Sequence, residues 1–175
     1  MAREVVARWP GLTLEMNGAD NEGAARADVI VLATPWDSAI PTVRPLRDAL
    51  AGKVVISMAN ALAKEGREML ALIPPRGSVA ATVQAALPGS LVAAAFHHLP
   101  ASEMEDLDSG LEADVLVCSD HAEATGVAMG LIDAMPGLRP LDTGTLSQAA
   151  AIEAFTAVCI TLNIRTVPLP RHGVS

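Results

Sequence analysis

The sequence contains almost no aromatic residues: two Trp, two Phe and no Tyr make up 2% of its 175 residues. Because single-stranded nucleic acid stacks its bases on aromatic side chains, this scarcity argues against such a ligand. Positive charge is also scarce, since 12 Lys and Arg stand against 20 Asp and Glu and the formal net charge is −8. An excess of negative charge opposes binding to nucleic acid or to an anionic membrane surface. We therefore expect neither as a partner.

Cysteines and long apolar runs are scarce as well. Cys118 and Cys159 both lie in apolar stretches, which fits buried thiols in a reducing compartment better than a disulfide framework. No run approaches the roughly 18 apolar residues of a membrane-spanning helix. The N-terminal residues M-A-R-E are not followed by the apolar core of a signal peptide. These absences predict a cytoplasmic protein.

Several motifs of catalysis and phosphate binding are missing. No G-x-G-x-x-G or Walker loop joins a strand to a helix, and no serine, Ser57 included, lies in a G-x-S-x-G elbow. His97 and His98 are adjacent, so their side chains leave an extended chain on opposite sides, and no third ligand follows at helical spacing. We expect no metal centre.

What the sequence does contain is a series of short apolar runs. The first lies in residues 27–38, A-D-V-I-V-L-A-T-P-W-D-S, where five consecutive apolar residues predict a central strand covered on both faces. Strands that alternate with helix-length segments are typical of an α/β fold with a doubly wound, mostly parallel sheet. We expect a single domain over 1–166 and a frayed tail at 167–175. The further strands are predicted at 53–58, 91–96, 114–119 and 138–141.

Helix signals lie between these runs. Asp37 or Ser38 is predicted to cap a helix to about residue 50, with Pro45 kinking or restarting it. Ser78 is predicted to cap a helix to Leu87 and Asp120 a helix over 122–135. The segment 62–76 is predicted to be partly helical.

The longest helix is expected over 144–165. Apolar residues recur in it at positions 152, 155, 158, 159 and 162, and we expect this helix to pack on the domain or to form a dimer. Glu153 interrupts the apolar pattern. It could be an interface or pocket residue, and a water-exposed helix edge explains it equally well.

Polar or turn-forming residues follow three of the predicted strands. They are Thr34 to Trp36, Ala59 to Ala61 and His97 to Ala101. Because parallel strands end at the same edge of a sheet, these three loops are expected to form one ligand crevice. The alternative is that they are ordinary connections. His97 in particular fits either a ligand contact at a pocket rim or a loop histidine whose hydrogen bonds are satisfied internally.

Six segments together resemble the NADPH-dependent coenzyme F420 reductases, also called F420H2:NADP oxidoreductases. The likeness covers about residues 12 to 165, and A-A-A-F-H-H-L-P-A is its most specific piece. It also includes A-D-V-I-V-L-A-T-P-W-D, G-R-E-M-L-A-L-I-P-P-R-G-S-V-A-A-T-V-Q-A-A-L-P, D-V-L-V-C-S-D, G-L-R-P-L-D and I-E-A-F-T-A-V.

The resemblance implies a Rossmann-like enzyme that passes a hydride between NADP(H) and the 8-hydroxy-5-deazaflavin coenzyme F420, with a homodimer as the expected assembly. It implies that the Ala33 to Pro35 loop flanks the NADP ribose and phosphate bridge. Asn60 is then near the nicotinamide half, and His97 and Ala101 border the meeting point of the two rings. No protein acid or base is required, because the cofactors carry the chemistry. The expected cofactor-binding residues are Ala33, Thr34, Pro35, Asn60, His97, His98 and Ala101.

Members of this family begin with a strand, a glycine fingerprint, a helix and a second strand that is followed by a Ser-Arg type recognition of the NADP 2′-phosphate, and this arrangement is absent here. The fold is therefore expected to lack its first βα unit or units, either as a shortened record of a complete enzyme or as a short paralogue. A non-catalytic α/β module or inactive paralogue that pairs with a full-length partner is the alternative function. An oxidoreductase for a metal chelate or small hydroxy acid would need a catalytic Lys or acid in the crevice, and the sequence offers no convincing one.

Overall fold

The computed structural model of the protein describes residues 18–100, 104 and 111–166. The predicted frayed tail lies outside the described residues. The helices are α2 (Asn21–Ala24), α3 (Trp36–Val43), α4 (Val79–Ala86), α6 (Ala122–Asp133) and α7 (Ala149–Thr166), with the 3-10 helices η1 (Arg44–Leu46) and η2 (Leu146–Gln148). The strands are β1 (Val29–Leu32), β2 (Val54–Ser57), β3 (Leu62–Glu65), β4 (Glu68–Ala71), β5 (Leu91–Ala94), β6 (Ala113–Ser119) and β7 (Leu138–Asp142).

The main sheet has the strand order β1-β2-β5-β6-β7. β1 pairs with β2 and β2 with β5 in parallel, and the last residues of these strands, Leu32, Ser57 and Ala94, lie side by side. β6 runs antiparallel to β5, with Ala94 opposite Cys118, and β7 is parallel to β6. The prediction of a mostly parallel α/β sheet is confirmed, and the reversal at β6 is a feature that the apolar runs did not reveal.

β1 lies at an edge of this sheet, so the prediction of a central strand was wrong for the part of the chain that the structure describes. Ile30 and Leu32 pack into the core, whereas Val29 and Val31 on the opposite face are exposed. An apolar run indicates only that a strand is suited to burial on both faces. Which elements cover those faces depends on the tertiary structure, and here α3 and α4 cover the face that carries Ile30 and Leu32.

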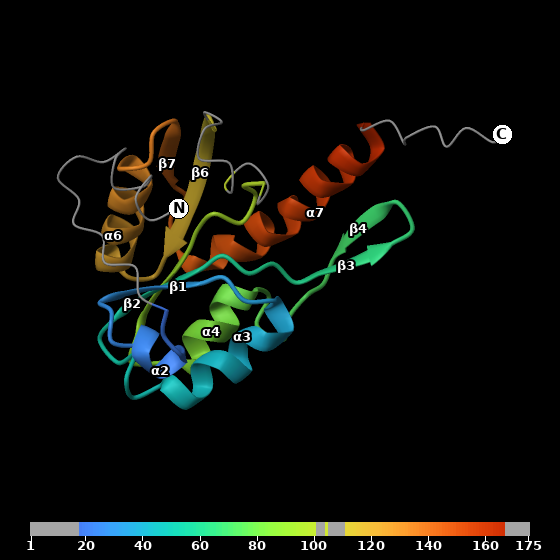
Figure 1. Ribbon diagram of the computed structural model, residues 1–175. Coiled ribbons are helices and arrows are strands. Elements are labelled where there is room, and N and C mark those ends of the chain that lie inside the picture. The colour runs from blue at the N-terminus through green and yellow to red at the C-terminus, as the bar shows by residue number, and fades with distance from the viewer. Residues whose placement is uncertain (1–17, 101–103, 105–110, 167–175) are drawn as a thin grey trace.

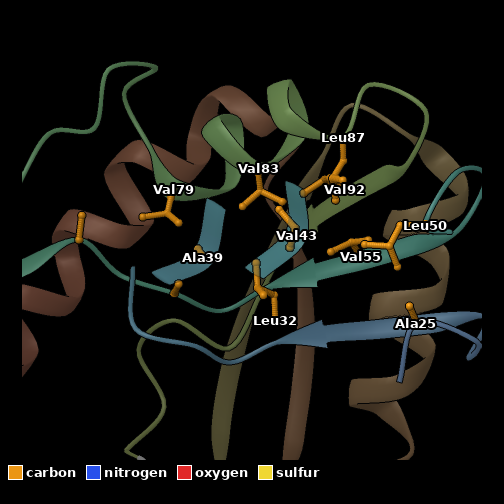
Figure 2. Close-up of a cluster of buried hydrophobic side chains, with 12 residues drawn as sticks. Ala25, Leu32, Ala39, Val43, Leu50, Val55, Val79, Val83, Leu87 and Val92 are labelled. Carbon is orange, nitrogen blue, oxygen red and sulfur yellow. The ribbon is translucent and has the colours of Figure 1, made fainter. Parts of the chain in front are cut away.

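Helices pack on both faces of the sheet (Figure 1). On one face, α3 and α4 contribute Val43, Val79 and Val83 to a buried cluster that also contains Val55 and Val92 of the strands (Figure 2). On the other face, α6 packs its small residues and Ile132 against β2, β5, β6 and β7. The small side chains of β5 are buried between these layers.

Residues 62–71 form a β-hairpin, and the prediction of a partly helical segment was wrong. Glu65 pairs with Glu68 across a two-residue turn in which Gly66 has φ of +58°, a conformation that glycine adopts without strain. The hairpin lies beside the outer half of α7 (Figure 1), where the Met69 N–H donates to Thr161 Oγ1 at 2.8 Å. The residues of this segment are compatible with a helix, but the segment forms strands that contact α7, which is distant in the sequence.

The helix starts follow the predictions only in part. Ser78 caps α4, since its Oγ accepts from the Ala81 N–H at 3.0 Å, as predicted. Pro45 restarts the chain as the 3-10 helix η1, also as predicted. The cap of α3 is the backbone of Pro35, so neither Asp37 nor Ser38 caps it.

The remaining two helices also differ at their N-termini. α6 has His121 at its N-cap, and the Asp120 carboxylate accepts from the Leu146 N–H at 3.0 Å instead. α7 begins at Ala149, later than the predicted residue 144, because η2 precedes it. The cap of α6 differs because the Asp120 carboxylate binds a backbone N–H that is distant in the sequence.

Among the described residues, 146–166 form one helical stretch whose length and hydropathy would suffice to cross a membrane, which the search for long apolar runs did not anticipate. A core helix of a soluble protein meets the same criteria. Glu153 and Thr156 of this stretch are buried against other parts of the protein, whereas Phe155, Val158 and Leu162 are half exposed. Within the part of the chain that the structure describes, the apolar pattern therefore lies mainly on the half-exposed face of α7.

Candidate functional site

The ends of β1, β2 and β5 meet at one edge of the sheet. The Met58 N–H donates to the Leu32 carbonyl at 3.2 Å, and the Ala95 N–H donates to the Ser57 carbonyl at 3.1 Å, so the pairing continues just past the strands. Beyond them, Asn60 Nδ2 donates to the His97 carbonyl at 2.9 Å. Two of the three predicted loops thus touch through Asn60 and His97. The third, Thr34 to Trp36, follows the neighbouring strand β1 and lies at the same edge.

Buried polar atoms without hydrogen-bond partners among the described residues gather at these loops. Such atoms are costly, because each has lost its water without gaining a replacement. Ser57 was weighed in the sequence only as a nucleophile, but it adds a fully buried hydroxyl here. The signal for it was a polar residue at the end of the strand, within the run K-V-V-I-S-M. The atoms are Thr34 Oγ1, Ser57 Oγ, Asn60 Oδ1, His97 Nδ1 and Nε2, and His98 Nδ1.

The predicted loop after β1 lies nearer to solvent than the other two. Ala33 and Pro35 are exposed and Thr34 is half buried. Pro35 ends the strand and starts α3, because it lacks an N–H and disfavours a helical Thr34. The loop can therefore present Thr34 Oγ1 and the backbone to a molecule bound along the edge. Ala101 lies outside the described residues.

The loop after β5 has an unusual backbone. Phe96 has φ of +65°, the left-handed conformation that residues with large side chains rarely adopt. Such strain persists only where surrounding contacts hold it, and it is common at functional sites. The contacts hold the His97 carbonyl, which accepts from Asn60 Nδ2 and, at 3.1 Å, from Thr156 Oγ1 of α7. Thr156 also makes a longer contact of 3.4 Å with the Ile152 carbonyl.

His97 is a neutral imidazole in the folded protein. Its side chain is buried, and burial is the main cause that lowers its pKa from 6.5 to about 4. The charge of His98 lowers the pKa further, and the backbone of Met58 raises it by a smaller amount. At neutral pH the ring can therefore donate or accept a hydrogen bond, but it does not carry a positive charge.

His98 makes a side-chain contact of its own. Its Nε2 lies 2.7 Å from the Asp114 carbonyl oxygen of β6, and its Nδ1 is buried without a partner among the described residues. Asp114 in turn binds Arg139 of β7 through both carboxylate oxygens. The two histidines therefore connect the site to different neighbours. No group of three potential metal ligands stands among the described residues.

A mostly parallel sheet with helices on both faces defines a Rossmann-like α/β protein, and its carboxyl edge carries polar atoms that have no partner among the described residues. Residues 6–61 match the family described as NADP oxidoreductase coenzyme F420-dependent. The chain is similar to the F420-dependent NADP reductase of Methanocaldococcus jannaschii, with 35% identity over 94% of this chain and 74% of that protein. The protein therefore belongs to the family of F420-dependent NADP reductases.

Two further relatives agree. The F420-dependent NADP reductase of Methanothermobacter thermautotrophicus is 34% identical over 87% of this chain and 68% of its own length. Among solved structures, a putative F420-dependent NADP reductase from Arthrobacter sp. FB24 superposes with a TM-score of 0.72 at 25% identity. That match covers 82% of this chain and 68% of the other. The family resemblance carried by the sequence motifs is thus confirmed.

Proposed function

We propose that the protein is an oxidoreductase that transfers a hydride between NADP(H) and coenzyme F420. The similarity to the Methanocaldococcus jannaschii reductase over 94% of this chain carries the proposal. The strand-edge site supports it, because flat redox cofactors bind in open α/β sheets at the carboxyl ends of the strands. Thr34, Asn60 and His97 are the chain's contributions to that site.

The residues at the edge fit a polar, flat ligand. Thr34 Oγ1 and Asn60 Oδ1 are buried acceptors without a partner among the described residues, as a bound dinucleotide would require. We assign the Ala33 to Pro35 loop to the NADP ribose and phosphate bridge and Asn60 to the nicotinamide half. His97 and Ala101 border the place where the nicotinamide and deazaflavin rings meet, and His98 bounds it on the β6 side.

The chemistry comes from the cofactors, which exchange a hydride directly when they are stacked. The chain's part is to hold the rings close and to keep water away. His97 suits this task because it is neutral near pH 7 and can hydrogen-bond a ring substituent without attracting a counterion. Asn60 holds the backbone of His97 and leaves its own Oδ1 for the ligand.

We propose a homodimer formed through α7. Phe155, Val158 and Leu162 are 50, 53 and 56% exposed and lie on the helix at a spacing that forms one stripe. A cavity of about 400 Å³ adjoins this stripe and is lined by Met69 of the hairpin. A second copy would cover both the stripe and the cavity.

We place the protein in the cytoplasm, because Cys118 and Cys159 are free thiols.

The proposed activity is tested by mixing the purified protein with NADPH and coenzyme F420 and following the visible absorbance of the deazaflavin. We expect NADPH-dependent bleaching. Thr34→Val should weaken NADPH binding roughly two- to tenfold, the equivalent of one lost hydrogen bond. Thr145→Val is the matched control, because its exposed hydroxyl contacts only that of Ser147 among the described residues. Absence of bleaching, together with elution in complex with a full-length partner, would favour the non-catalytic alternative.

A further inference from the structure

A buried glutamate joins α7 to α4. Glu153 is in the second turn of α7 and is only 5% exposed. Its Oε2 accepts from the Val79 N–H at 2.8 Å and its Oε1 from the Ala80 N–H at 3.1 Å. These N–H groups belong to the first turn of α4, where a helix has no partners of its own. The carboxylate therefore fixes α7 to the N-terminus of α4.

The same face of α7 holds the loop after β5. Thr156 follows Glu153 by three residues, so the two side chains lie on one face of the helix. Its hydroxyl donates to the His97 carbonyl at 3.1 Å, the oxygen that Asn60 also binds. The helix is thus attached at two points one turn apart, on α4 and on the strained loop that carries His97.

We propose that Glu153 is a positioning residue for hydride transfer: by fixing α7 on α4, it places the Thr156 hydroxyl on the His97 carbonyl and thereby sets the position of the His97 ring. This inference rests on the proposed function, because it concerns the same site. Without the carboxylate, α7 could slide or rotate by a fraction of an ångström. The hydrogen bond to His97 would then lengthen, and the strained Phe96 backbone would lose one of its supports.

The surroundings of Glu153 are apolar, so a carboxylate at this position indicates a specific role. Its neighbours Ala80 and Ala149 belong to an apolar cluster, where an apolar side chain would pack without the cost of burying a charge. Burial raises the pKa of Glu153 to about 7, and the hydrogen bonds from Val79 and Ala80 limit the rise. The link between α7 and α4 should therefore weaken as the pH falls through neutrality, because a protonated carboxyl accepts less strongly.

Few charged groups pack against Glu153 among the described residues. α4 carries no charged residue and presents only its backbone N–H groups to Glu153. Cys118 of β6 is a neutral thiol, because burial raises its pKa to about 11, with Glu153 among the smaller causes. On the hairpin, Glu68 pairs with Arg165 near the far end of α7. Two imidazoles also lie near the observed positions, because His98 adjoins His97 and His121 Nε2 lies 3.0 Å from Gln84 Oε1 of α4. A transition near pH 7 that spreads from α4 to the loop after β5 is therefore assigned to Glu153 by its loss in Glu153→Gln.

The test is a pH titration of the full chain followed by backbone amide NMR. In the wild-type protein, the amide signals of residues 79 and 80 and those of residues 97 and 98 should shift together with a midpoint near pH 7. Glu153→Gln should abolish both shifts, and Glu123→Gln, on the exposed face of α6, should abolish neither. Titration at residues 79 and 80 alone, or at neither pair, would overturn the proposal, because Glu153 would then not act on His97.

A second variant keeps the test decisive if Glu153→Gln does not fold. Thr156→Val retains the shape of the side chain and the Glu153 cap but removes the hydroxyl. It should leave the titration at residues 79 and 80 intact and abolish it at 97 and 98. Persistence of both shifts in this variant would show that the link does not run through Thr156, and the proposal would fail.

Kinetics then test the consequence for the reaction. Glu153→Gln and Thr156→Val should each slow hydride transfer by about tenfold while the KM for NADPH changes little, because a misplaced ring affects the rate more than binding. The double variant should be no slower than the slower single variant. Thr161→Val is the control on the same helix, since its hydroxyl contacts the hairpin. A wild-type protein without activity would refute the proposed function, while the NMR titration would still decide whether Glu153 positions His97.

Discussion

Replacing His97 with glutamine should make the protein more resistant to acid. In the folded state the pKa of His97 is lowered from 6.5 to about 4, mainly because the ring is buried and only 3% of the residue is exposed. Below pH 6.5 the unfolded chain therefore binds a proton that the folded protein does not. Stability is lost between pH 6.5 and pH 4, and the full loss is about 3 kcal/mol.

The loss is measured by urea unfolding of wild-type protein and His97→Gln at pH 7.5 and pH 4.5. Relative to the variant, the wild type should lose about 2 to 3 kcal/mol over this range. Glu153 acts in the opposite direction, because a pKa raised to about 7 adds stability as the pH falls toward 4.5. It is present in both proteins, so its contribution cancels in the difference. His98→Gln should raise the pKa of His97 and reduce the loss. Parallel pH profiles for wild type and His97→Gln would refute the burial argument.

Three further predictions concern other parts of the molecule. His97→Ala should slow hydride transfer by roughly tenfold and change NADP binding much less, as stopped-flow kinetics and titration would measure; equal losses, or none, would remove His97 from the site. Gly137→Ala should cost about 3 kcal/mol in thermal unfolding, because φ is +85° and a Cβ would lie 2.3 Å from the Leu111 carbonyl oxygen; an unchanged melting temperature would contradict this. Leu162→Glu should convert the proposed dimer to a monomer in light scattering, and an unchanged mass would exclude this face of α7.

Much of the site was predictable because its signals are local. Asn60 and His97 each follow an apolar run, and strands that run in parallel bring such positions to one edge. The Ser78 cap and the restart at Pro45 also follow from the chemistry of single residues and their neighbours. Ser57 was missed because its hydroxyl was judged only by the absence of a nucleophile motif.

Other features depended on partners distant in the sequence. The segment 62–71 contains residues that suit a helix, and its hairpin packs along α7, nearly a hundred residues later. Asp120 is an acceptable helix cap, but the Leu146 N–H competes for its carboxylate. Local propensities differ by about 1 kcal/mol or less per residue, so one tertiary hydrogen bond suffices to reverse such a choice.

The sequence by itself determined the family through its motifs. It also determined the alternation of strands and helices and the loops that end at the carboxyl edge of the sheet, because apolar period and turn chemistry act over a few neighbouring residues. Only the tertiary structure decided that β1 lies at an edge, that β6 runs against β5, and that Glu153 and Thr156 join α7 to α4 and to His97. Each of these features depends on which strand or helix packs against another that is distant in the sequence, and this pairing is determined by packing across the whole domain.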